Sequence, residues 1–240
     1  MGNYAKWIGG GLGWAFGGPI GALIGYAFGS VIGNLRVEVG GQDGGVTRPG
    51  DFAASLLVLS AAVVKADGRV EKSELNYVER FYTRQFGAAN AERYMLAMES
   101  ILSQEFSCSE ICGQIRTHMD YASRVQLLHF LFGIAKADDH VAKEEVRTIF
   151  NIAMDMGVST PDFESVQAMF YKETASAYKI LEISPEASDG EIKKAFRLMA
   201  VKFHPDKVAH LGEEFQSAAH EKFQRVNEAY DSIKKERGFN

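Results

Sequence analysis

The sequence predicts an all-α protein in three parts: a glycine-zipper membrane segment, a helical bundle with an internal duplication, and a C-terminal helical hairpin. Three observations predict this architecture. The first part is uncharged with glycine at every fourth position, the second contains one acidic segment twice, and the third repeats apolar residues at spacings of three and four. We place the parts at residues 1–36, 51–175 and 176–240, with a flexible linker at 37–50.

Composition narrows the class of protein. Hydrophobic residues make up 46% of the 240 residues and charged residues 24%, which is typical of a globular chain and not of a disordered one. Residues 51–175 carry 12 basic and 18 acidic side chains, and this acidic balance argues against a nucleic-acid partner. The two cysteines, Cys108 and Cys112, are too few for a zinc site, and we expect them to be reduced thiols.

The first part has the pattern of a membrane segment. No charged residue occurs between Lys6 and Arg36, and glycine recurs at every fourth position from Gly9 to Gly33. On a helix these glycines form a stripe without side chains, which lets two helices approach closely in lipid. In water each glycine would cost about 1 kcal/mol relative to alanine. We therefore expect residues 7–35 to enter a membrane and to offer a homodimer interface through the glycine stripe.

Three geometries remain open for residues 7–35. A single helix would be longer than the roughly 30 Å hydrocarbon core and would span it once. Residues 12–17 resemble residues 24–29, with Gly18-Pro19 between them, which favours a hairpin of two short helices inserted at the interface. A flexible glycine-rich tail is the third geometry. A cleaved signal peptide is disfavoured, because one lysine precedes the apolar stretch and no small-residue cleavage site follows it.

The second part contains the duplication. Residues 65–74 align with residues 136–145, with six of ten positions identical, and each copy lies between two apolar helical stretches. Two helix–turn–helix units therefore form one bundle. The pattern Ala-Asp-Gly-x-Val-x-x-x-Glu resembles the TerB family, which is named for tellurite resistance.

The duplicated segment supplies four acidic residues for two alternative roles. They either converge to hold Ca²⁺ or Mg²⁺, or they cap and turn the chain at helix starts. An EF-hand is excluded by the spacing of the acidic residues, and we favour the capping role. The four residues are Asp67, Glu74, Asp138 and Glu145.

The third part is organised around the tripeptide His204-Pro205-Asp206. Ser188 and Glu191 form a capping box at the start of the preceding helix, and Pro205 ends that helix. A second apolar helical stripe follows within residues 215–233. The first helix has its apolar face at Ile192, Ala195, Phe196, Met199, Ala200 and Phe203, and its basic face at Lys193, Lys194 and Arg197.

Two antiparallel amphipathic helices joined by a His-Pro-Asp loop, with Tyr178-x-x-Leu181 ahead of them, resemble the J-domain. The ending from Asn227 to Phe239 is most similar to the membrane-anchored DjlA-type proteins, which carry a TerB-like domain before a C-terminal J-domain. The resemblance implies docking on a cytosolic Hsp70 (DnaK-type) chaperone and stimulation of its ATP hydrolysis. It implies a bacterial inner membrane location, with both domains facing the cytoplasm. The implied Hsp70-binding residues are His204, Pro205, Asp206, Lys193, Lys194, Arg197, Lys202 and Lys207.

We expect no enzymatic activity, because His204 and Asp206 have no nucleophile in a catalytic context and the chain has no phosphate-binding loop. The alternative function is a membrane stress or metal-sensing scaffold, in which the TerB-like domain binds metal or a partner and the J-domain is auxiliary. No cofactor is expected beyond the Ca²⁺ or Mg²⁺ of that alternative.

Overall fold

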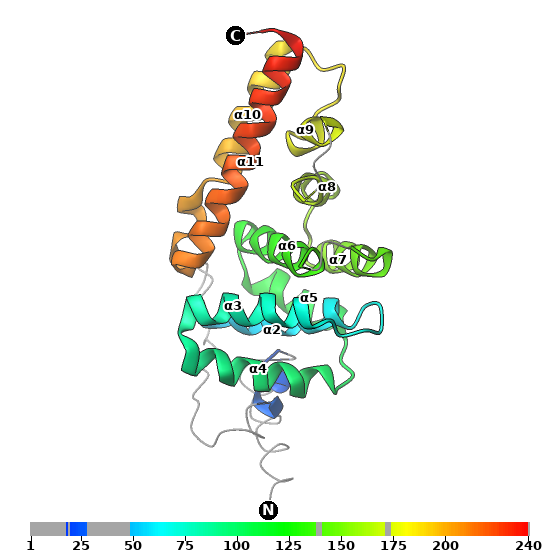
Figure 1. The fold of residues 1–240 in the computed structure, drawn as a ribbon, viewed down its shortest axis with the longest axis vertical. Helices are drawn as coiled ribbons and strands as arrows, with labels where there is room; N and C mark the ends of the chain where they lie inside the picture. The colour runs from blue at the N-terminus through cyan, green and yellow to red at the C-terminus, as the bar shows by residue number, and fades with distance from the viewer. Residues whose placement is uncertain (1–17, 19, 28–48, 138–140, 171–173, 240) are drawn as a thin grey trace, which may run out of the picture.

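The computed structural model describes residue 18 and residues 20–27, 49–137, 141–170 and 174–239 (Figure 1). Every regular element in these ranges is a helix, as the sequence predicts. We call the helices from α2 to α8 the bundle and those from α9 to α11 the C-terminal domain. The bundle contains α2 (Pro49–Val64), α3 (Lys72–Phe86), α4 (Ala88–Leu102), α5 (Cys108–His118), α6 (Tyr121–Ala135), α7 (Lys143–Asp155) and α8 (Thr160–Ala168). The C-terminal domain contains α9 (Thr174–Ile180), α10 (Asp189–Lys202), the 3-10 helix η1 (Pro205–Leu211) and α11 (Glu213–Arg237).

Helices α2 and α6 lie at the centre of the bundle, because their apolar residues cover most of their circumference. α2 packs against α4, α6 and α7, while α6 also packs against α3 and α8. Gly133 on α6 allows the ring of Tyr77 on α3 to approach so closely that a Cβ atom would overlap it. One copy of the duplicated segment joins α2 to α3 and the other leads from α6 to α7, as the duplication predicts.

The duplicated segment brings two buried glutamates together. Glu74 on α3 and Glu145 on α7 are 5% and 6% exposed, and their carboxyl groups hydrogen-bond to each other. The backbone N–H of Glu71 donates to Glu74 Oε2 at 2.9 Å, and that of Ala142 donates to Glu145 Oε2 at 2.6 Å. Burial is the main cause that raises the pKa of Glu74 to about 8, and the hydrogen bond and charge of Glu145 raise it further. The pair therefore holds one proton at neutral pH.

The structure describes three of the four acidic residues of the duplicated segment. Asp67 accepts the N–H of Arg69 at 2.8 Å, which is a turn role, while Glu74 and Glu145 each accept an N–H at the start of their own helix. Asp138 lies outside the described residues. In the described ranges no three His, Cys, Asp or Glu side chains gather as metal ligands would. The capping role accounts for the three described residues, and a four-carboxylate metal site stays a prediction.

Glu74→Gln should stabilise the protein at pH 8 and change it little near pH 4. The folded pKa of Glu74 is about 8 against an ordinary 4.5, so the wild type loses stability as pH rises between these values. Glutamine mimics the protonated carboxyl, since it accepts from Glu71 and donates to Glu145. We expect a gain of about 1–3 kcal/mol at pH 8. Urea unfolding at both pH values measures it, with Glu79→Gln on the exposed face of α3 as control. Equal pH slopes in wild type and variant would contradict the shared proton.

Part of the predicted membrane segment packs on the bundle. Residues 20–27 are helical, and Ile20, Ile24 and Ala27 are buried in the hydrophobic core. The N–H of Ile20 donates to the side-chain oxygen of Gln114 on α5 at 3.0 Å. Among the described residues, no helix combines the length and the apolar character needed to cross a bilayer. Most of the glycine stripe lies outside the described ranges, so the span and the dimer stay predictions.

The C-terminal domain contains the predicted hairpin of α10 and α11. Ser188 accepts the N–H of Glu191 and Glu191 Oε2 accepts the N–H of Ser188 at 2.8 Å, which confirms the capping box. Between the two helices the ring of Phe196 stacks on that of Tyr230, with centroids 4.2 Å apart. The hairpin holds the His-Pro-Asp loop at one end of two paired helices, as the apolar spacing predicts.

Candidate partner-binding site

The loop between α10 and η1 presents an imidazole and a carboxylate in a fixed relation. α10 ends at Lys202, and His204 caps the 3-10 turn that starts at Pro205. His204 Nδ1 accepts the N–H of Asp206 at 3.3 Å and lies 3.4 Å from its Oδ2. The His204 ring meets that of Phe223 on α11 edge to face, with centroids 5.9 Å apart. The His204 side chain is 50% exposed and that of Asp206 is 82% exposed, so both can reach a partner.

A mixed basic and apolar stripe on α10 leads to this loop. Lys194 and Arg197 are exposed, as the helical periodicity predicts. Leu198 and Val201 are 62% and 63% exposed, more than any other large apolar side chain in the described residues. These four residues are spaced as neighbours on one helix face, and we call them the outer stripe.

The apolar half of the outer stripe was missed from the sequence. The apolar face predicted for this helix excludes Leu198 and Val201, and the predicted binding residues exclude them as well. The available signal was their spacing from Lys194, which places both on the solvent side of a helix whose core face is already complete. Two large apolar side chains left side by side in water indicate a contact surface.

The remaining predicted basic residues differ in their surroundings. Lys207 is exposed, three residues beyond His204. Lys193 is half-buried, and its ammonium lies over the ring of Phe239, 5.5 Å from the centroid. The structure therefore leaves Lys194, Arg197 and Lys207 exposed on the C-terminal domain and places Lys193 in an aromatic contact.

Lys202 is engaged by two carboxylates. Its ammonium pairs with Asp162 at the start of α8 and with Glu182 Oε1 at 2.8 Å, just after α9. Burial alone would lower the pKa of Lys202, but hydrogen bonds and charges from the two carboxylates raise it above its ordinary value. Glu182 reaches the lysine from a backbone φ of 57°, a left-handed conformation that is uncommon for a residue other than glycine. The predicted partner-binding lysine next to the loop is thus paired within the molecule, with 27% of its side chain exposed.

Two models of known protein families match this chain, one over the bundle and one over the C-terminal domain. The family model described as tellurite resistance protein TerB matches residues 53–168, and the DnaJ domain model matches residues 176–237. The co-chaperone protein DjlA of Vibrio parahaemolyticus is 26% identical over 231 residues, covering 80% of each chain. That of Shewanella oneidensis is 25% identical over 211 residues, again covering 80% of each. The chaperone protein DnaJ of Wolinella succinogenes is 52% identical over 59 residues, which are 25% of this chain and 14% of its own. No solved structure matches the chain.

Proposed function

We propose that this chain, which belongs to the DjlA-type co-chaperones that join a TerB domain to a C-terminal J-domain, docks on an Hsp70 (DnaK-type) chaperone and stimulates its ATP hydrolysis. The bundle is the TerB domain, and the C-terminal domain is the J-domain. The observation that carries the proposal is the exposed His-Pro-Asp loop at the end of the outer stripe. The family is one of co-chaperones and not of enzymes, so the chemistry belongs to the partner.

The loop would act through the carboxylate of Asp206. An exposed carboxylate pairs strongly with an arginine when both of its oxygens accept N–H groups. Pro205 restricts the backbone beside Asp206, and His204 accepts the N–H of Asp206, so the carboxylate leaves the hairpin from one fixed turn. We infer that this fixed carboxylate triggers the partner, with His204 and Pro205 as its positioning residues.

The outer stripe would supply the docking contact. Lys194 and Arg197 would meet an acidic surface of Hsp70 and speed encounter, while Leu198 and Val201 would lose water on contact and slow dissociation. Lys207 extends the basic surface beyond the loop. Lys193 and Lys202 complete the proposed set of binding residues.

A steady-state ATPase assay tests the proposal. A DnaK-type Hsp70 is incubated with ATP and increasing amounts of the full-length protein, and phosphate release is compared with that of each protein alone. We expect release to rise to a plateau only when both proteins are present. A flat response would contradict the proposed function.

Membrane attachment through residues 7–35 is part of the proposal. The uncharged stretch supports it, and Hsp70 needs ATP, so the TerB domain and the J-domain would face the cytoplasm at the bacterial inner membrane. Insertion would require residues 20–27 to leave the bundle, and with it the hydrogen bond between Ile20 and Gln114. In lipid, the glycine stripe would then pair two copies of the chain.

The triple variant Gly21→Leu, Gly25→Leu and Gly29→Leu should keep the chain on the membrane but abolish pairing, because leucine adds apolar surface and fills the stripe. Flotation with phospholipid vesicles measures attachment, and cross-linking on those vesicles measures pairing. Both are compared with Ala22→Leu, which lies off the stripe. Cross-linked dimers in the triple variant would contradict the glycine interface, and a wild-type chain that does not float would contradict attachment.

A further inference from the structure

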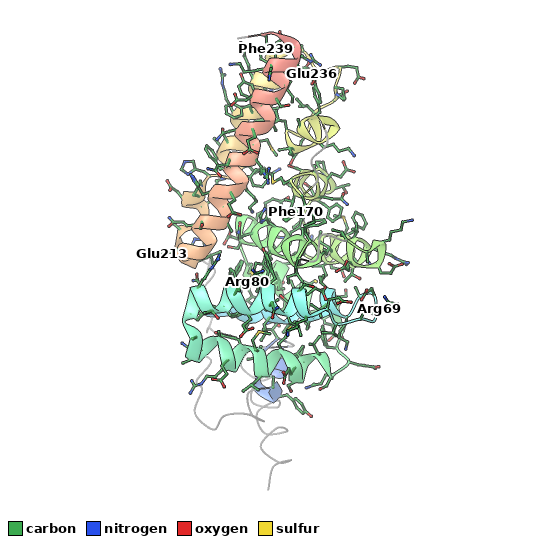
Figure 2. All side chains as sticks on the ribbon, viewed as in Figure 1. Arg69, Arg80, Phe170, Glu213, Glu236 and Phe239 are labelled. Carbon is green, nitrogen blue, oxygen red and sulfur yellow. The ribbon has the colours of Figure 1, made fainter. Side chains whose placement is uncertain are left out.

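The loop end of the J-domain lies against the TerB domain. η1 and α11 contact α6, η1 also contacts α2, and α11 also contacts α3. Figure 2 shows Glu213, at the start of α11, near the bundle and Glu236 and Phe239 at the opposite end of the hairpin. The side chain of Gln85 on α3 donates to the carbonyl of Leu211 at 3.2 Å. The contact with α2, α3 and α6 therefore lies at the end of the hairpin that carries the His-Pro-Asp loop.

The ion pair between Lys202 and Asp162 is one of several polar contacts at this interface, beside the hydrogen bond from Gln85 and the approach of His210 Nε2 to Asp120 Oδ2 at 3.6 Å. Asp162 belongs to the TerB domain, and its side chain is 3% exposed. It also accepts hydrogen bonds from the hydroxyl groups of Tyr121 and Ser159. Burial alone would raise the pKa of Asp162, but the bonds from Lys202, Ser159 and Tyr121 lower it below its ordinary value. A buried carboxylate needs such a counter-charge, so docking of the J-domain neutralises Asp162.

The same interface also buries an amine, which costs free energy and opposes the contact between the two domains. A cavity of about 100 Å³ lies beneath the loop between the two domains, and among its lining residues are Gln126 of α6, His204 and Lys222 of α11. Lys222 is 2% exposed, and burial lowers its pKa to about 7. Its ammonium lies 5.6 Å from the centroid of the Phe203 ring, and in the described residues no carboxylate lies within ion-pair distance of it. Burying this amine costs free energy, so Lys222 opposes the docked arrangement of the two domains, which we call the closed state.

Lys202 cannot serve two acidic surfaces at once. It stands two residues before His204, and the proposed function assigns it to the surface of Hsp70. In the closed state its ammonium is committed to Asp162 and Glu182, while Asp206 and the outer stripe stay exposed. An Hsp70 could thus reach the exposed groups first and would have to displace Asp162 of the TerB domain to pair with Lys202.

We propose that the surface around Asp162 on the TerB domain is a docking site for its own J-domain, which competes with Hsp70 for Lys202 and limits stimulation until the two domains separate. The competition with Hsp70 rests on the proposed function, whereas the docking of the J-domain on the TerB domain rests on the observed contacts. These two parts of the proposal need separate measurements.

Two variants of the full-length chain shift the contact in opposite directions. Asp162→Asn keeps an acceptor for Tyr121 and Ser159 but removes the TerB-domain charge that pairs with Lys202, leaving Glu182 of the J-domain in place. Lys222→Met removes the desolvated amine and keeps a side chain of similar length. Neither residue belongs to the proposed Hsp70-binding set. Glu164→Gln, an exposed carboxylate on the same helix as Asp162, is the matched control.

Hydrogen exchange without Hsp70 measures the intramolecular contact. We expect Asp162→Asn to speed exchange of the backbone amides in η1 by about two- to tenfold, the range that loss of one partly buried ion pair produces. Lys222→Met should slow it, and Glu164→Gln should leave it unchanged. Exchange in η1 that matches the wild type in both test variants would overturn the docking site.

The ATPase assay then measures competition at a subsaturating concentration of the co-chaperone. We expect Asp162→Asn to raise stimulation and Lys222→Met to lower it, in step with the exchange results. Faster exchange with unchanged stimulation would overturn the competition, while the stimulation by the wild type would keep the proposed function intact. A wild type that stimulates nothing would overturn the proposed function and the competition together, and exchange would still decide whether the domains dock.

Discussion

His204→Gln should remove most of the stimulation of Hsp70 ATP hydrolysis while the chain stays folded. The imidazole accepts the N–H of Asp206 and contacts the ring of Phe223, and these two contacts set the direction of the carboxylate. Glutamine is flexible and lacks the ring, so Asp206 would lose its fixed position. If the displaced Asp206 carboxylate loses one charged hydrogen bond with the partner, the cost is about 1.5–3 kcal/mol, so we expect stimulation at a given concentration to fall by roughly ten- to hundredfold.

The comparison that isolates the loop uses His220→Gln. His220 is an exposed histidine on α11 of the same domain, so this variant makes the same chemical change away from the loop. Thermal unfolding followed by circular dichroism should give similar midpoints for wild type, His204→Gln and His220→Gln, because His204 is half exposed. Normal stimulation by a folded His204→Gln protein would remove the loop from the mechanism.

The double variant Lys194→Glu and Arg197→Glu should weaken Hsp70 binding by about tenfold or more at low salt, because it places like charges against an acidic surface. We reverse the charge at these two residues only. Lys193 is left unchanged, because its ammonium already lies over the ring of Phe239. Binding by the wild type should weaken as salt is added, and binding by the variant should change less.

Titrations of Hsp70 binding at several salt concentrations measure both effects. The matched control is Lys179→Glu with Lys235→Glu, which makes the same change in net charge at two exposed lysines of the J-domain away from α10. Equal weakening in the two double variants would mean that overall charge, and not the outer stripe, governs binding.

Features that depend on neighbours along the chain could be predicted from the sequence. The capping box at Ser188, the apolar face of α10 and the turn that begins at Pro205 follow from spacings within one or two helical turns. The repeated segment predicts paired helix–turn–helix units for the same reason. The helical class therefore followed from local periodicity over most of the described chain.

Features that join distant segments could not be predicted in this way. Asp162 lies in the first turn of α8, where an acidic residue is common for local reasons, and nothing near it in the sequence indicates that it holds Lys202. Lys222 appears in the sequence as a charged residue on an amphipathic helix, yet packing against α6 buries it. The composition of the glycine-rich segment predicts membrane attachment, which stays a prediction, and it does not indicate that residues 20–27 pack on the bundle. Each of these contacts depends on how whole domains meet.

The TerB domain is arranged as a two-fold dimer would be, but within one chain. α2 meets its duplicate α6, α2 contacts α7 as α6 contacts α3, and Glu74 faces its own duplicate Glu145. Each central helix thus packs against helices of both halves, so neither half buries all of its apolar surface alone. The contacts with the J-domain come from both halves, since Gln85 belongs to the first and Asp162 follows the second. Docking of the J-domain, as proposed, would therefore use a surface that is complete only when both halves have come together.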